Sequence, residues 1–255
     1  MTDQPNRTDV STTVDTGNPH SARVWNYWVG GTDNFPADRI AGDTLAAVNP
    51  AITTVAAAVR AFLRRTVRFL AVERGIRQFL DVGSGLPTAG NVHQVAQRCA
   101  PSCRVVYVDH DPQVHRYVRA GSLLTGTGQG LVRLIDADMY DPSGLLRGAA
   151  EHLDLGRPVA VSFLGVLGHI PDLDEARDLV RYLMDRTWPG SHLVVCDGSG
   201  VIANETIRDA RIAYGDFGAL PYLSRTPVEI ESFFEGLDWV EPGLVALQRW
   251  RPDPD

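Results

Sequence analysis

The residues best suited to chemistry form a glycine-rich turn, DVGSGLPT, over residues 81–88. Gly83 and Gly85 allow the backbone to approach a ligand closely. The helix predicted after the turn offers free N–H groups and the positive end of its dipole to a carboxylate or phosphate. Asp81, which ends the preceding strand, either contacts the ligand or caps the turn. This segment predicts a site for a ligand that carries an anionic group.

Two further acids follow the next two predicted strands. Asp109 is placed to accept both hydroxyls of a ribose. Asp138 is placed to accept the amino group of an adenine, although Asp136 and Asp141 are rivals for this role. Met139 adds a backbone N–H for a ring nitrogen and a soft apolar face. Together with the glycine-rich turn, these acids describe an adenosine-containing cofactor.

The spacing of the three acids supports one shared ligand. Asp81 and Asp109 are 28 residues apart, and Asp109 and Asp138 are 29 apart. Each interval is one strand–helix–strand step, so the acids lie along the same edge of a parallel sheet. Ligands of open α/β sheets bind at this edge, beyond the carboxyl ends of the strands.

The turn departs from the fingerprint for dinucleotides, G-x-G-x-x-G. Counted from Gly83, the third glycine would fall at position 88, which is Thr88. Pro87 also stiffens the turn and lacks an N–H. A pyrophosphate therefore fits poorly, and a smaller anionic group fits better.

Alternating strands and helices position these residues. Apolar stretches such as RVVYVD are typical of strands covered on both faces, and short loops imply a parallel sheet. Two last strands separated by Pro242-Gly243 predict a hairpin. We therefore expect an α/β, doubly wound, mostly parallel seven-stranded sheet of Rossmann-like type, with an antiparallel C-terminal hairpin. The expected strands are 78–82, 104–109, 130–135, 158–164, 192–196, 238–241 and 244–250.

Three regions differ in composition. Residues 1–20 are polar and predict a flexible tail, 21–75 predict a helical N-terminal cap, and 76–255 predict the cofactor-binding domain. The aromatic segment VWNYWVGGTDNFP, with Tyr27 and Asn34, is either a lid that closes over the cofactor or a packed brace. It also offers a surface through which two copies could form a homodimer.

A long helix over residues 51–74 carries Arg60, Arg64 and Arg68 on one face. This face is either solvated or a patch for an anionic substrate or partner. Helices are also expected near 37–48, 88–100, 112–124, 172–184, 204–214 and 226–236.

The amino-acid composition argues against several classes of protein. The 255 residues include 24 basic residues, all of them Arg, so lysine Schiff bases and P-loops are excluded. The net charge of -7 disfavours nucleic acid as a partner. Three cysteines form no disulfide framework and no metal site is expected. A signal core and a membrane-spanning run are not seen, which favours a cytoplasmic protein.

Four motifs resemble class I S-adenosylmethionine-dependent methyltransferases: DVGSGL at 81–86, YVDHDP at 107–112, DADM at 136–139 and VLGHIPD at 166–172. The segments VWNYWVGGTDNFPADR, QFLDVGSGLPT, HQVAQ, FFEGLDWVEPGLV and RWRP are similar to an actinobacterial subfamily of methyltransferases whose acceptor is not established. The resemblance covers roughly residues 20–252.

The resemblance implies S-adenosylmethionine as the cofactor and a role for each matching residue. The glycine-rich turn would wrap the methionine part, Asp109 would hold the ribose, and backbone after the fourth strand would pass under the sulfonium. Pro87 stands where many relatives have a third glycine. The residues implied are Gly83, Ser84, Gly85, Asp109, His110, Asp138, Met139, Leu164 and Gly165.

The expected function is methyl transfer from S-adenosylmethionine to a small-molecule acceptor that the residues do not identify. His169, after the fourth strand, is either a catalytic or acceptor-contacting residue or a structural histidine. Methyl transfer relies mainly on positioning, so it needs no catalytic dyad. The alternatives are a non-catalytic S-adenosylmethionine-binding module and an NAD-dependent oxidoreductase.

Overall fold

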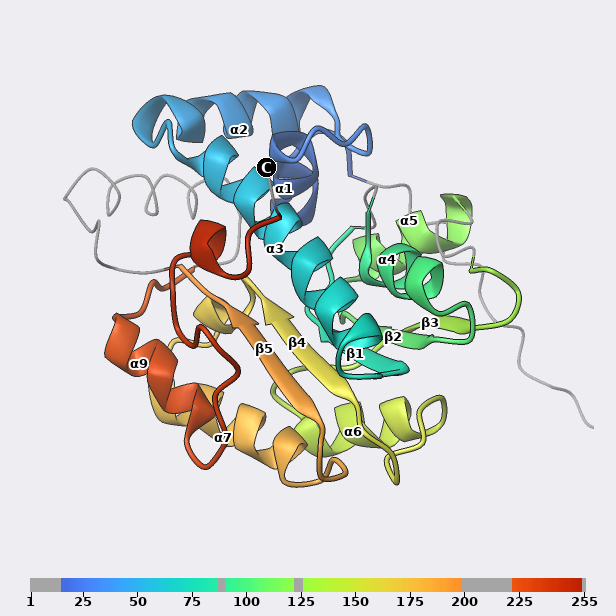
Figure 1. Ribbon diagram of the computed structural model, residues 1–255. Helices are drawn as coiled ribbons and strands as arrows, with labels where there is room; N and C mark the ends of the chain where they lie inside the picture. Colours follow the sequence, from blue (N-terminus) through green and yellow to red (C-terminus); the bar gives the residue numbers. More distant parts are fainter. Residues whose placement is uncertain (1–14, 87–89, 122–125, 199–221, 254–255) are drawn as a thin grey trace, which may run out of the picture.

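A five-stranded parallel sheet forms the centre of the computed structural model, which describes residues 15–86, 90–121, 126–198 and 222–253 (Figure 1). The strand order is β3-β2-β1-β4-β5. The order reverses at β1, which pairs with both β2 and β4, so the carboxyl end of β1 is the switch point where ligands of such sheets bind. The strands are β1 (Gln78–Val82), β2 (Arg104–Val108), β3 (Leu131–Ile135), β4 (Ala160–Leu164) and β5 (His192–Cys196).

Helices cover both faces of the sheet, as expected for a doubly wound domain. Phe79 and Tyr107 face α3 and α4, whereas Leu80 and Val82 face α6 and α7. Neighbouring strand residues point to opposite faces, so both layers are built from continuous apolar runs. The helices are α1 (Ser21–Trp28), α2 (Pro36–Val48), α3 (Ile52–Val72), α4 (Val92–Cys99), α5 (Pro112–Gly121), α6 (Pro142–Ala150), α7 (Leu173–Met184) and α9 (Pro227–Glu231).

A buried ion pair joins α1 to α2. The Arg23 guanidinium donates from Nε to Asp38 Oδ2 over 2.8 Å, and neither side chain is more than 1% exposed. Asp38 also accepts the backbone N–H groups of His20 and Phe35, each at 2.8 Å. Arg23 donates in addition to the side chain of Gln113 at the start of α5. Helix α1 is thereby fixed both to α2 and to the helix that follows β2.

The expected C-terminal hairpin is wrong. Residues 238–246 form turns and irregular chain, and a short 3-10 helix, η4 (Leu247–Arg249), follows. The backbone here bonds to α3 rather than to a strand, because Arg65 donates to the carbonyls of Leu247 at 2.5 Å and Trp250 at 2.9 Å. The Trp250 ring packs edge-on against the rings of Phe62 and Phe69, with 5.6 Å between the ring centroids in each pair. The described part of the chain therefore holds five strands, not seven.

Helix α6 was not expected from the sequence. Its signal is Asp141-Pro142, in which Asp141 caps the helix by accepting the N–H of Gly144 at 2.9 Å. The helix expected over 204–214 and the turn residues Pro87 and Thr88 lie outside the described residues.

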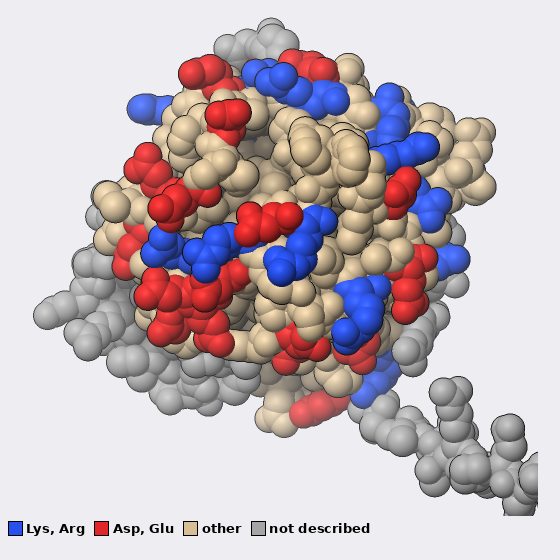
Figure 2. Space-filling model, turned by 90° about the horizontal axis from the view of Figure 1, so that it is seen from below, with Lys and Arg blue, Asp and Glu red and all other residues tan. Residues whose placement is uncertain are grey.

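Charged side chains of both signs lie side by side on the face seen in Figure 2. Exposed pairs include Arg177 with Asp174 at 3.1 Å and with Glu235 at 2.7 Å. Such exposed pairs contribute little to stability. Among the described residues, no single helix has the length and hydropathy needed to cross a membrane, and only α2 and α3 taken together, bent by 105°, meet that criterion.

Candidate cofactor site

The two glycines in the turn after β1 have different surroundings. Gly83 has φ of +70°, and a Cβ there would lie 2.2 Å from Cγ2 of Val166. Gly85 has φ of +61°, and a Cβ there would meet no atom within 4 Å. Gly83 thus allows close packing against the chain after β4, whereas Gly85 borders open space. Both φ values lie in the left-handed region that favours glycine.

Asp109 is fixed beside this turn. The N–H of Gly85 donates to Asp109 Oδ2 over 2.8 Å, and the N–H of Asp111 donates to Oδ1 over 3.0 Å. Burial raises the pKa of Asp109 above its usual value, and these backbone donors oppose the shift. A carboxylate has about four lone-pair positions. Asp109 therefore retains capacity to accept hydroxyl groups of a ligand at the carboxyl edge of the sheet.

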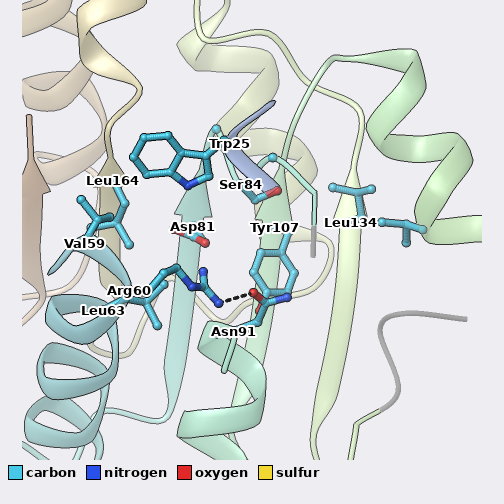
Figure 3. A pocket seen from close by; sticks show the side chains of 13 residues that line it. Trp25, Val59, Arg60, Leu63, Asp81, Ser84, Asn91, Tyr107, Leu134 and Leu164 are labelled. Atoms are coloured by element: carbon cyan, nitrogen blue, oxygen red, sulfur yellow. Dashed lines mark hydrogen bonds between the residues drawn. The ribbon is translucent and has the colours of Figure 1, made fainter. Parts of the chain in front are cut away.

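A pocket opens next to the glycine turn, between α1, α3, β1 and β2 (Figure 3). Its cavity volume is about 50 Å³, and the pocket opens to solvent on one side. Gly83, Ser84 and Gly85 form part of its wall, as does Leu164 at the end of β4. The pocket therefore lies at the switch point of the sheet and includes five of the predicted site residues: Asp81, Gly83, Ser84, Gly85 and Leu164.

Asp81 is a buried acid within this pocket. Its Oδ1 accepts a hydrogen bond from Ser162 Oγ of β4 over 2.6 Å. Burial raises the pKa of Asp81 to about 6, although the Ser162 hydrogen bond and the charge of Arg60 lower it. The acid thus has a double role, since it bonds to β4 and also faces the pocket.

Arg60 of α3 is a pocket residue that the sequence did not single out from its neighbours. Its guanidinium donates from Nη2 to Asn91 Oδ1 over 2.9 Å (Figure 3). Burial lowers the pKa of Arg60, and the charge of Asp81 opposes this shift. By contrast, Arg68 pairs with Asp253 on the surface. Helical spacing predicted that these arginines share one face of α3. The packing of α3 against the sheet is what buries Arg60 and leaves Arg68 exposed.

Tyr107 of β2 also lines the pocket. It begins the motif YVDHDP, but no site role was predicted for it. Its hydroxyl accepts the backbone N–H of His93 at 2.9 Å and lies 2.8 Å from His93 Nδ1. Burial lowers the pKa of His93 to about 4, so this imidazole is neutral at pH 7. The Tyr107 hydroxyl is therefore held in one position by α4.

The aromatic segment contributes Trp25 to the pocket wall. Tyr27, the residue predicted for this role, instead donates its hydroxyl to Asp43 of α2 over 2.9 Å. Asn34 donates to Asn26 Oδ1 at 3.0 Å and to the carbonyl of Gly31 at 2.8 Å. In the structure these two residues hold the α1–α2 connection together and do not line the pocket.

The residues predicted for the adenine lie further along the same edge of the sheet. His110 is exposed directly after Asp109, and Asp138 is exposed after β3. Asp138 Oδ1 accepts the N–H of Tyr140 over 3.0 Å. Met139 lines a second, wider hollow together with Tyr140 and the start of α7. The structure therefore does not bring Asp138 and Met139 into the pocket beside the glycine turn.

The chain after β4 continues this edge. Gly165 has φ of +77° and donates its N–H to the carbonyl of Cys196 over 2.6 Å. His169 is half-buried in a short 3-10 helix. Its ring lies edge-on to the ring of Tyr222, with 5.2 Å between the ring centroids. Near it, Asp197 pairs with the buried Arg225 at 3.3 Å and accepts from the Tyr222 hydroxyl. This pair anchors the chain that returns after the fifth strand.

These residues fit S-adenosylmethionine. A glycine turn with open space at Gly85, an acid at a ribose position and a polar pocket of opposite charges match a nucleoside that carries an amino-acid group. Among the described residues, no group of three or more His, Cys, Asp or Glu side chains is arranged to hold a metal ion. Fold and site together are typical of class I α/β domains that bind an adenosine-containing cofactor at the carboxyl edge of the sheet.

Comparison with known proteins identifies the family. A family profile described as S-adenosyl methyltransferase matches residues 7–255. The chain therefore belongs to this family, and it is an S-adenosylmethionine-dependent methyltransferase.

Two solved structures resemble the chain over almost its whole length. A DUF574 family protein from Streptomyces avermitilis is 40% identical, with a TM-score of 0.88 over 94% of this chain and 92% of that chain. A candidate methyltransferase from Thermobifida fusca is 37% identical, with a TM-score of 0.84 over 94% of this chain and 89% of that chain. No curated protein matches the chain.

Proposed function

We propose that the enzyme methylates a small-molecule acceptor, with the cofactor lying along the carboxyl edge of the sheet and its ribose on Asp109. The observation that carries this proposal is the contact between Asp109 Oδ2 and the N–H of Gly85, at 2.8 Å. It joins the ribose acid to the turn that borders the pocket. Bound S-adenosylmethionine supplies a methyl group already activated by its sulfonium.

The chain's own residues bind and orient the reactants. The turn at Gly83–Gly85 lets backbone lie against the cofactor, and Trp25 and Leu164 supply apolar walls that exclude water. Holding two reactants in line contributes roughly 7–11 kcal/mol in favourable cases. Positioning of this size accounts for catalysis without a dedicated dyad.

The adenine is proposed to lie between His110 and the chain after β3. Asp138 would accept its amino group, and Met139 would provide a backbone N–H and an apolar contact. Two observations support this role: Asp138 is exposed, and its Oδ1 is held 3.0 Å from the backbone nitrogen of Tyr140. Backbone at Leu164 and Gly165 would pass under the sulfonium.

Residues 21–75 are proposed to act as a cap that completes the site. Support comes from Trp25 of α1 and Arg60 of α3, which both line the pocket. Tyr27 and Asn34 serve this cap by bracing its fold through Asp43 and Asn26. The cytoplasmic location and the homodimer stay predictions from the sequence.

The acceptor is proposed to bind beyond β4, beside His169. The imidazole is half-buried and its ring orientation is fixed by Tyr222. For an acceptor that must lose a proton, His169 would act as a general base, which adds roughly 10²–10⁴-fold to the rate. A His169→Asn variant should then retain cofactor affinity while losing turnover, measured as S-adenosylhomocysteine released with an extract of small metabolites.

Calorimetric titration with S-adenosylhomocysteine tests the cofactor assignment. We expect Asp109→Ala to weaken binding about 10- to 100-fold, because hydrogen bonds to a charged group contribute roughly 1.5–3 kcal/mol. Asp154→Ala, which alters an exposed acid near the amino end of β4, is the matched control. Unchanged affinity in Asp109→Ala, or tight binding of NAD by the wild type, would contradict the proposal.

A further inference from the structure

A buried arginine packs against the short 3-10 helix that follows β4, η1 (Leu167–His169). Arg225 is 2% exposed, and its guanidinium donates to the carbonyl of Leu167 over 2.7 Å and to the carbonyl of Ile170 over 2.5 Å. These two carbonyl groups lie on either side of His169 along the chain. A guanidinium presents several N–H donors in one plane, so it can hold more than one acceptor in a fixed direction. Arg225 therefore fixes both ends of the turn that carries His169.

Asp197, which follows β5, is the counter-charge of this arginine. Its Oδ2 lies 3.3 Å from Arg225 Nη1, and the Asp197 side chain is fully buried. Burial raises the pKa of Asp197 above its usual value, whereas the hydrogen bonds from Tyr222 and Gly198 and the charge of Arg225 oppose that shift. The ion pair therefore ties η1 to the carboxyl end of β5.

Tyr222 connects the same acid to the imidazole of His169. Its hydroxyl donates to Asp197 Oδ1 and accepts the backbone N–H of Gly198 over 3.0 Å. Burial raises the pKa of Tyr222 well above its usual value, so the hydroxyl keeps its proton at neutral pH. The Tyr222 ring meets the imidazole at an interplanar angle of 85°. Asp197 thus fixes the backbone of η1 through Arg225 and the plane of the imidazole through Tyr222.

The close approach of Tyr222 depends on Gly168, the residue before His169. A Cβ at Gly168 would lie 2.6 Å from Cε2 and Cζ of Tyr222 and 2.7 Å from the carbonyl oxygen of Leu223. The N–H of Leu223 also donates to the carbonyl of Gly168 over 2.7 Å. Residues 222–225 are therefore in direct contact with the backbone of η1, and any movement of this segment would displace His169.

We propose that Arg225 is a positioning residue for methyl transfer, which together with Asp197 and Tyr222 holds the His169 imidazole toward the acceptor. This inference rests on the proposed function, in which His169 receives the proton that the acceptor loses as the acceptor bonds to the methyl carbon and the C–S bond breaks toward sulfur. Apolar residues can often replace a buried ion pair without loss of stability. A buried pair that bridges two carbonyl groups around His169 therefore favours a role that needs fixed geometry.

A double-mutant cycle tests whether Arg225 acts through His169. Turnover is measured as S-adenosylhomocysteine released from S-adenosylmethionine with an extract of small metabolites. We expect Arg225→Lys to lower turnover by roughly 10-fold or more, within the roughly 10²–10⁴-fold that a general base contributes. Lys keeps the charge but cannot donate to both carbonyl groups and to Asp197 in one plane. In the His169→Asn background, the same substitution should change turnover by less than about twofold.

Nuclear magnetic resonance of protein with isotope-labelled histidine reports the imidazole without an acceptor. The ring signals of His169 are those missing from His169→Asn. We expect Arg225→Lys and Tyr222→Leu to change the nitrogen shifts of His169 and to leave those of the other histidines unchanged. Tyr222→Phe, which keeps the ring, should restore the shifts in part. Arg181→Lys, on the exposed face of α7, is the matched control.

Calorimetry with S-adenosylhomocysteine shows whether each variant is folded, and affinities within about twofold of wild type are expected. Equal losses of turnover from Arg225→Lys in the wild-type and His169→Asn backgrounds, or unaltered ring signals of His169, would overturn the positioning role. Tyr222→Leu provides the same comparison if Arg225→Lys does not fold. Wild-type turnover in His169→Asn would instead refute His169 as the proposed base. If the wild type releases no S-adenosylhomocysteine, the ring signals alone decide the positioning role.

Discussion

Asp81 shows how the burial of a single acid makes stability depend on pH. Burial raises its pKa from 3.8 to about 6, so the folded chain holds this proton more tightly than the unfolded chain. A carboxyl group shifted in this direction contributes stability at low pH that is lost as the pH rises through the folded pKa. At neutral pH the ionised form is retained in the pocket, where the charge of Arg60 and the hydrogen bond from Ser162 stabilise it.

The first prediction follows from that shift. As pH rises from about 4 to about 6, the free energy of unfolding of Asp81→Asn should increase relative to wild type by up to about 3 kcal/mol. Asn keeps a similar shape but never ionises, so the gain measures the cost of ionising Asp81. Urea denaturation at a series of pH values provides the measurement. Parallel pH profiles of the two proteins would show that Asp81 does not titrate in this range.

At the scale of elements, the turn between β1 and α4 depends on the different surroundings of its two glycines. Gly83→Ala should destabilise the fold, because its Cβ would lie 2.2 Å from Val166 Cγ2 in a left-handed backbone. Gly85→Ala should cost only about 1–2 kcal/mol, the ordinary strain of that backbone, since its Cβ meets no atom within 4 Å.

Cofactor affinity separates the two variants further. The Cβ of Gly85→Ala occupies the open space beside Asp109, so we expect binding of S-adenosylhomocysteine to be lost while the fold remains. Adding Val166→Ala to Gly83→Ala should recover part of the lost stability. Thermal denaturation and calorimetry provide the two readouts. A Gly85→Ala protein with wild-type affinity would show that the cofactor does not approach this turn.

The sequence predicted the elements whose signals are local. The strand QFLDV and the glycine turn after it were predicted correctly because periodicity and turn chemistry act over a few residues. The position of Asp109 directly after β2, beside that turn, also agrees with the structure. The prediction of a C-terminal hairpin was wrong because Arg65, which is 185 residues from Trp250 in the sequence, binds the carbonyl groups of Leu247 and Trp250. These carbonyl groups therefore do not pair with a second strand. Arg60 and Tyr107 became pocket residues only through packing of α3 and α4 on the sheet. No pattern along the chain indicates which of several arginines will be buried.

At the scale of the whole molecule, the first two helices are joined to the sheet by polar contacts as well as by packing. Arg23 links Asp38 of α2 with Gln113 of α5, and His20 contacts Asp111 at 2.7 Å. Asp111 in turn lies two residues from Asp109. The segment that brings Trp25 to the pocket is thus connected to the chain that holds Asp109.

The last prediction concerns this connection. Arg23→Ala leaves the Asp38 carboxylate buried without its counter-charge, a change that costs about 3–5 kcal/mol. A loss of that size should lower the thermal midpoint by about 6–20 °C for a chain of this length.

S-adenosylhomocysteine at 100 times its dissociation constant should recover about 2.7 kcal/mol if it binds only the folded state. Because Arg23→Ala also loosens Trp25, we expect the variant to need more ligand than wild type for the same recovery. Arg68→Ala, which breaks an exposed pair, is the control and should leave the midpoint almost unchanged. An Arg23→Ala protein with wild-type stability and ligand affinity would show that the first two helices are held by apolar packing alone.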